Sequence, residues 1–137
     1  MSVVQKFLMG VKQKSAATDA NAEDPRLRGR TYAIPFDRVW NEAVSLASGG
    51  LRRWRVLNAD DHEGVIQALA TDSIFRSTAS VTIRIVLDEN AQTRVDAAAE
   101  NVSGRADLGA CARHLGRFFR ALDVAVAADR RPGANGR

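Results

Sequence analysis

Cysteine and long apolar runs are scarce in this chain of 137 residues, and each scarcity excludes a class of protein. The single cysteine, Cys111, cannot form an internal disulfide, which excludes a disulfide-stabilised secreted domain and favours a reducing compartment. No apolar run reaches the roughly 18 to 20 residues of a membrane-spanning helix. Gln5 and Lys6 interrupt the first residues too early for a signal peptide. We therefore expect a cytoplasmic protein.

Signatures of catalysis and nucleotide binding are also missing. The sequence contains no Walker loop, no G-x-G-x-x-G or G-x-S-x-G motif and no paired-cysteine zinc pattern. Apolar residues make up 45% and charged residues 26%, which is typical of a globular protein and disfavours a wholly disordered or collagen-like chain. The length suits one domain with a hydrophobic core. We expect a single non-enzymatic domain without a metal or a cofactor.

The net charge of +4 and the isoelectric point near 10.0 suggest nucleic-acid binding until the charges are located. Residues 31–127 carry 11 Arg against 12 Asp and Glu, a net charge of −1. Residues 1–30 have a net charge of +3 and include all three lysines, and residues 128–137 have +2. Because the excess lies at the ends, it points to attachment more than to the reading of a nucleic-acid sequence, and nucleic acid is not an expected partner.

The chain divides into four segments. Residues 1–14 are predicted to form a short basic amphipathic helix, with contact residues at helical spacing: Val4, Phe7, Leu8, Val11 and Lys12. Such a helix either adsorbs weakly to an anionic membrane or packs on its own domain or a partner. Residues 15–30 lack periodicity and are predicted to be a linker, and residues 128–137 a disordered basic tail. One α+β domain is expected over residues 31–127.

Hydrophobic periodicity predicts seven elements in this domain. They are strand 31–34, helix 36–47, strands 54–56, 65–71, 81–87 and 93–101, and helix 107–126. Consecutive hairpins favour an antiparallel sheet, and two amphipathic helices must cover one of its faces. The expected fold is a two-layer α+β sandwich with about five strands, two helices on one face and the order β-α-β-β-β-β-α.

The other face of the sheet is predicted to be incompletely covered. Alternation assigns to it Arg53, Arg55, Leu57, Ile66, Ala68, Arg84, Val86, Arg94, Asp96, Ala98 and Glu100. A solvated face does not require apolar residues, so a partner, a second copy or the first helix is expected to cover it. The candidate contact residues are Arg53, Arg55, Leu57, Arg84 and Val86. Nucleic acid is a weaker alternative, because carboxylates dilute the arginines and no aromatic residue alternates with them.

A family resemblance comes from the run GRADLGACARHLGRF at residues 104–118. Through Gly104, Asp107, Gly109 and Phe118 it resembles the C-terminal signature of domain-of-unknown-function family 1499, a bacterial and plastid family. The resemblance covers about residues 31–122 and implies fold and boundaries, but the family has no established activity to carry over. Cys111 stands where the family has asparagine and His114 where it has arginine, which implies that any shared site is altered.

Two polar clusters have competing interpretations. Asp107, Cys111 and His114 at i, i+4 and i+7 fit a nucleophile or a partial metal site. We favour instead a helix cap at Asp107 and a small buried side chain at Cys111. The run from Asp60 to Glu63 offers four potential metal ligands, but its spacing does not match a calcium loop, so a hairpin turn is favoured.

These observations predict a non-catalytic protein that acts through protein contacts. It would dock as an accessory subunit on a larger assembly, or on a further copy of itself, and the basic first helix would allow peripheral contact with a membrane. The alternative function is a carrier of a small apolar ligand. Its pocket would lie between sheet and helices and be lined by Trp40, Trp54, Phe118 and Phe119.

Overall fold

The structure is a computed structural model that describes residues 15–18, 29–73, 76–103 and 109–128. Its elements are β1 (Ser15–Ala17), β2 (Arg30–Tyr32), α2 (Phe36–Ser45), the π-helical turn η2 (Leu46–Gly50), β3 (Trp54–Asp60), β4 (Val65–Thr71), β5 (Thr78–Leu87), β6 (Thr93–Asn101) and α3 (Ala110–Ala128).

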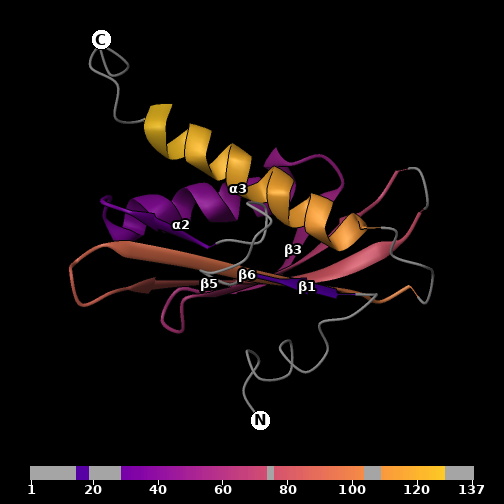
Figure 1. The fold of residues 1–137 in the computed structure, drawn as a ribbon, viewed down its shortest axis with the longest axis horizontal. Helices are drawn as coiled ribbons and strands as arrows, with labels where there is room; N and C mark the ends of the chain where they lie inside the picture. Colours follow the sequence, from indigo (N-terminus) through magenta and orange to yellow (C-terminus); the bar gives the residue numbers. More distant parts are fainter. Residues whose placement is uncertain (1–14, 19–28, 74–75, 104–108, 129–137) are drawn as a thin grey trace.

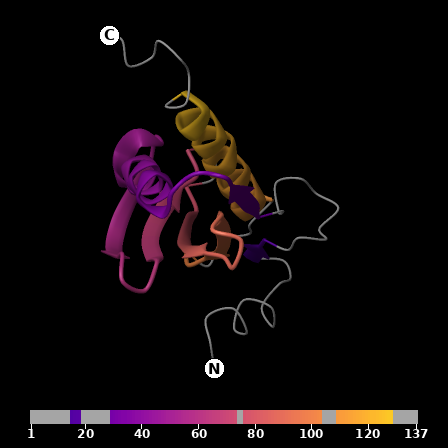
Figure 2. The same cartoon turned by 90° about the vertical axis from the view of Figure 1, so that its left-hand side faces the viewer.

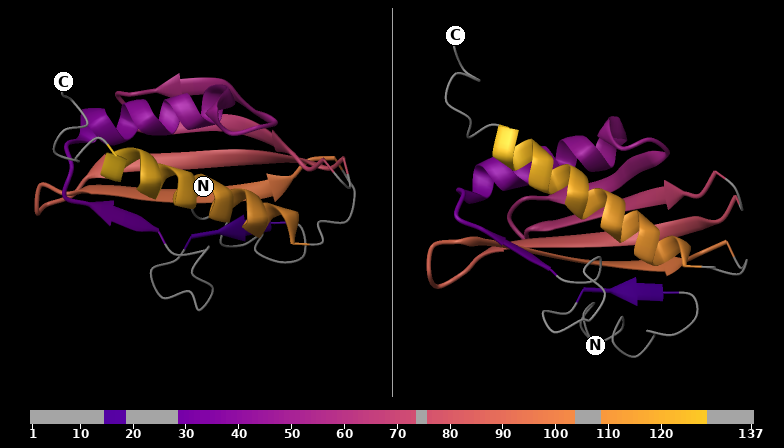
Figure 3. Two further views of the ribbon diagram at one scale, coloured as in Figure 1. Left: turned by 90° about the horizontal axis from the view of Figure 1, so that it is seen from above. Right: turned by 45° about the horizontal axis from the view of Figure 1, so that its top comes forward.

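The six strands of the described residues form one antiparallel sheet in the order β1-β6-β5-β4-β3, and β2 also pairs with β6. Both helices lie on the same face of this sheet (Figures 1 and 2). Helix α2 lies towards β3, and α3 crosses the sheet obliquely (Figure 3). The predicted two-layer α+β sandwich is therefore confirmed, with one strand more than expected.

The additional strand corrects the predicted linker at its described ends, residues 15–17 and residue 30, whereas residues 19–28 lie outside the described part of the chain. Ser15–Ala17 form β1 opposite Glu100–Ala98, and Arg30–Tyr32 form β2 opposite Val95–Thr93, on the same outer edge of β6. The amide of Thr18 donates to the carbonyl of Ala97 over 2.8 Å. A three-residue strand of serine and alanine has no alternation for a periodicity argument to detect, because pairing with β6 alone defines it.

Helix α2 follows the predicted pattern. Pro35 precedes its first turn in an extended conformation, with ψ of 148°, and offers no amide that would lack an acceptor. Val39, Ala43 and Ala47 recur at helical spacing and are fully buried. The helical run continues through η2 until Gly49, whose φ of +121° strongly favours glycine. This ending brings the chain down to Leu51 and into β3.

The core lies between the helices and the inner face of the sheet. Helix α3 contributes its predicted apolar side: Cys111, Leu115, Phe118, Phe119, Leu122 and Val126. The prediction that Ile66 and Ala68 lie on the open face is wrong. Ile66 pairs with Ile83 and Ala68 with Val81, and these pairs face the helices and are fully buried.

A second departure from simple alternation occurs in β3. Its pairing with β4 shifts between Val56 and Asn58, so Leu57 lies in a β-bulge and has no partner in the register. Leu57 is 53% exposed on the outermost strand. In none of the described helices is there a stretch long and apolar enough to cross a membrane.

Candidate functional site

The open face of the sheet carries most of the predicted contact residues. Arg84 lies opposite Asp96, and Val86 lies opposite Arg94, so these predicted residues share the face away from the helices. Arg55 joins them through its pairing with Leu69. Arg53 instead lies in the turn before β3 with a φ of +69°, and Leu57 occupies the bulge.

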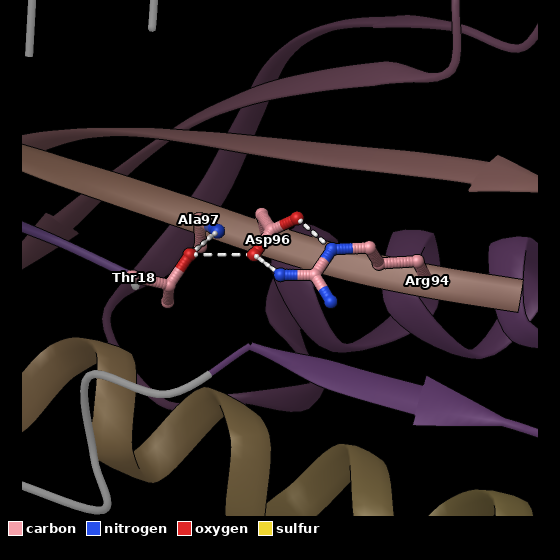
Figure 4. Close-up of polar contacts among 4 residues, drawn as sticks. All are labelled: Thr18, Arg94, Asp96 and Ala97. Atoms are coloured by element: carbon pink, nitrogen blue, oxygen red, sulfur yellow. Dashed lines mark hydrogen bonds and ion pairs between the residues drawn. The ribbon is translucent and has the colours of Figure 1, made fainter. Parts of the chain in front are cut away.

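Charges on this face are balanced within the face itself. The register places Arg55, Arg84 and Arg94 together with Asp60, Asp96 and Glu100. Arg94 donates to the Asp96 carboxylate from Nε over 2.8 Å and from Nη2 over 3.1 Å (Figure 4). The Thr18 hydroxyl donates to the same carboxylate over 3.0 Å and accepts from the Ala97 amide. A balanced, hydrogen-bonded surface of this kind suits contact with water.

On the helix side of the molecule, polar contacts from β2 hold α3 against the edge of the sheet. The Tyr32 hydroxyl donates to Asp123 Oδ1 over 2.6 Å, and Arg30 Nε donates to Asp123 Oδ2 over 3.2 Å. The Arg30 guanidinium also lies 5.0 Å from the centre of the Phe119 ring. Burial, followed by the hydrogen bond to Asp123 and its negative charge, raises the pKa of Tyr32 well above its usual value.

A second ion pair fastens the other end of α3. Arg113 Nη2 donates to Asp72 Oδ2 over 2.8 Å, and the Asp72 side chain is only 8% exposed. Asp123 is the only carboxylate in the described part of α3, and Arg30 and Tyr32 already engage it. These contacts hold α3 against the sheet at two points. No other acidic side chain of the described part of α3 is left to balance Arg117 and Arg120.

Helix α3 also borders a shallow groove of about 460 Å³. The lining residues come from the second half of α3 and from the residue after η2: Leu51, Arg117, Arg120, Ala121, Val124 and Ala125. Because Ala121 and Ala125 have short side chains, they leave a hollow beside Leu51. Val124 is 68% exposed, more than any other large apolar side chain of the described residues. The groove therefore offers an apolar floor to solvent.

Two arginines border this apolar floor. Within the described parts of the chain, neither Arg117 nor Arg120 has an ion-pair or side-chain hydrogen-bond partner. Arg113 and Arg30, by contrast, are bound to Asp72 and Asp123. The groove thus combines apolar surface with two guanidinium groups whose donors face water, an arrangement suited to a ligand that is both acidic and apolar.

Arg117 and Arg120 were not singled out in the sequence analysis, and the groove was missed. A signal was present, since Arg117, Ala121 and Val124 recur at i, i+4 and i+7 on one helix surface. Leu51 could not be associated with them, because its place beside α3 depends on how the chain descends from η2. The groove is a product of tertiary packing.

The aromatic residues predicted to line a ligand pocket pack against one another. Trp54 stacks on Phe118 with ring centres 5.8 Å apart, and Phe118 meets Phe119 edge to face at 5.3 Å. Trp40 stacks on Phe36 at 5.8 Å. These rings fill the space between sheet and helices, and none of them lines the groove.

The two polar clusters of the sequence also take structural roles. Cys111 is fully buried, as predicted, and His114 is 5% exposed with its ring against the edge of Trp54. Asp107 lies outside the described residues. Asp60 Oδ1 accepts the amides of His62 and Glu63 over 3.0 and 3.2 Å, which forms the hairpin turn favoured above. Across the described ranges, no group of three or more candidate side chains is placed to hold a metal.

Several predicted residues lie outside the part of the chain that the structure describes. They are Val4, Phe7, Leu8, Val11 and Lys12 of the first segment, and Gly104 and Asp107 of the family motif. The motif's Gly109 has a φ of +80° and its carbonyl accepts the amide of Arg113 over 3.1 Å, at the start of α3. Phe118 is fully buried in the core. The two described motif residues, Gly109 and Phe118, therefore contribute to the fold.

Comparison of the chain with protein-family models gives no match, and comparison with curated proteins gives none either. The resemblance to family 1499 stays a prediction from the motif. Inferences about function consequently rest on the chain's own surfaces.

Proposed function

We propose that this chain is a non-catalytic interaction domain that docks on a larger protein assembly, and that the groove beside α3 is its docking surface. The observation that carries the proposal is the pairing of an exposed apolar floor with Arg117 and Arg120, which lack partners among the described residues. Exposed apolar surface surrounded by arginine is typical of protein interfaces.

The open face of the sheet supports this function less well. Its arginines share the face with three carboxylates, and Asp96 already accepts hydrogen bonds from Arg94 and Thr18. A partner would have to replace these contacts, whereas it would gain new ones at Arg117 and Arg120. Peripheral membrane contact through residues 1–14 and family membership remain separate proposals, each resting on sequence alone.

Affinity purification of the tagged full chain from cells of the source organism tests the proposal. The double variant Arg117→Glu/Arg120→Glu should lose a partner that the wild-type chain retains, because both changes put a negative charge at the groove. The matched control Arg84→Glu reverses an exposed arginine on the open face and should retain that partner. Retention by the double variant and loss by the control would contradict the proposal and favour the sheet face.

A further inference from the structure

The partner's chemistry can be inferred from the groove, and this step rests on the proposed function. We propose that the groove beside α3 binds an acidic amphipathic helix of another protein, with carboxylates at Arg117 and Arg120 and an apolar side chain against Ala121, Val124 and Ala125.

Charge complementarity identifies the acidic character of the partner. Asp123, the single carboxylate of the described part of α3, accepts from Tyr32 and Arg30 on the sheet side, and Arg113 is engaged by Asp72. The net charge left at the groove is therefore the positive charge of Arg117 and Arg120. Each guanidinium presents a planar set of donors that matches a carboxylate, so an acidic partner would satisfy donors that water now satisfies.

Spacing favours a helical partner. Arg117 and Arg120 are three residues apart, which corresponds to a rise of about 4.5 Å along an α-helix. Side chains one turn apart on a partner helix are separated by about 5 to 6 Å, so two carboxylates in consecutive turns match the two arginines. The same turns present an apolar side chain between them, and helix-in-groove binding uses this pattern.

The lining of the groove argues against single-stranded nucleic acid as its ligand. A single-stranded nucleic acid would need aromatic side chains on which its bases could stack, and none of the six lining residues is aromatic. An apolar side chain on a helix, in contrast, projects far enough to enter the hollow.

Binding of synthetic peptides to the full chain tests this inference. The probe is a fluorescent peptide of about 15 residues in which leucine recurs at i, i+3, i+4 and i+7 and the other positions are mainly glutamate. The comparison peptide has lysine in place of every glutamate. Fluorescence anisotropy should show binding of the acidic peptide alone, and the affinity should fall as salt rises, because the ion pairs are at the surface.

Three variants locate the binding. Arg117→Glu/Arg120→Glu should weaken binding of the acidic peptide by about tenfold or more, through repulsion in place of attraction. Ala125→Trp should weaken it similarly by filling the groove without a change of charge. Arg84→Glu, on the open face, should leave the affinity unchanged. Circular dichroism of each variant should match the wild type, which separates loss of binding from loss of folding.

Several results would overturn the inference. They are no binding of the acidic peptide to the wild-type chain, equal binding of the lysine peptide, or binding that Arg84→Glu weakens and the groove variants do not. Groove-dependent binding of single-stranded DNA or of phosphatidylglycerol vesicles in place of the peptide would identify a different ligand. Sedimentation of the protein alone as a dimer that Arg117→Glu/Arg120→Glu dissociates would identify a second copy as the occupant. If the peptide fails while the groove variants still lose a cellular partner, the docking function stands and only the acidic helix is wrong.

Discussion

Tyr32 of strand β2 donates its hydroxyl hydrogen to Asp123 of helix α3 over 2.6 Å, although 91 positions separate the two residues in the chain. The bond joins the outer edge of the sheet to the helix that borders the groove. Arg30, on the same strand, binds the second oxygen of the carboxylate. The Asp123 carboxylate is thus bound to β2 and does not offset the positive charge at the groove. The same two contacts hold α3, which borders the groove, against the sheet edge.

Replacement of Tyr32 by phenylalanine measures what this bond contributes. Tyr32→Phe keeps the ring and removes a hydrogen bond to a charged acceptor, so the free energy of unfolding should fall by about 1 to 2 kcal/mol. Urea denaturation gives the value. Thr31→Ala, a change of the exposed neighbouring residue, should alter it by about 0.5 kcal/mol or less. Equal losses in the two variants would show that the bond adds nothing.

The ionisation of Tyr32 provides a second test, because it is the only tyrosine in the chain. Burial and Asp123 raise the folded-state pKa above the usual 10.0. Below pH 10.0 the phenol is protonated in both states and does not affect stability, whereas above it the unfolded chain releases the proton first. Stability should therefore fall as the pH rises beyond this value.

Ultraviolet absorbance of tyrosinate measures the effect directly. The native wild-type protein should show no tyrosinate until circular dichroism reports unfolding. Asp123→Asn removes the negative charge and should lower the pKa of Tyr32 relative to wild type. Tyrosinate formed in the native wild-type protein near the usual pKa would contradict the arrangement around Asp123.

Neighbouring residues of β4 test the corrected orientation of that strand. Ile66 is fully buried against the helices, whereas Val65 is half-buried on the open face. Ile66→Ala should cost about 2 to 5 kcal/mol of stability, because it leaves a cavity in the core. Val65→Ala should cost about 1 kcal/mol or less. A larger loss of stability for Val65→Ala than for Ile66→Ala would support the orientation first predicted from the sequence, with Ile66 on the open face.

The fold class was predictable because most elements carry strong periodic signals. Strand β6 alternates Val95, Ala97 and Ala99 with the outer residues Arg94, Asp96, Ala98 and Glu100, and α3 repeats large apolar residues at helical spacing. Strand β4 lacks such contrast: apolar residues occupy both faces, and only Gln67 and Thr71 mark the outer one. Which side chains of β4 face the helices therefore depends on its pairing with β5, and the periodicity of β4 alone does not predict that pairing.

The candidate site was less predictable than the fold. The arginines of α3 were visible in the sequence, but their lack of partners depends on contacts between distant segments, such as Arg30 with Asp123 and Arg113 with Asp72. The predicted sheet-face residues Arg84 and Val86 do share a surface. What the sequence could not reveal is that Asp96 and its neighbours balance the charge there.

Site-specific photo-crosslinking in cells of the source organism tests whether the groove beside α3 docks on another protein. A photoreactive phenylalanine derivative replaces Val124 at the groove or Leu87 at the end of β5, two exposed apolar positions on different parts of the molecule. Crosslinked products are then compared by mass. We predict an adduct with another protein from position 124, none from position 87, and loss of the first when Arg117→Glu/Arg120→Glu is added. An adduct from position 87 alone, or one from position 124 that survives this double change, would contradict this prediction.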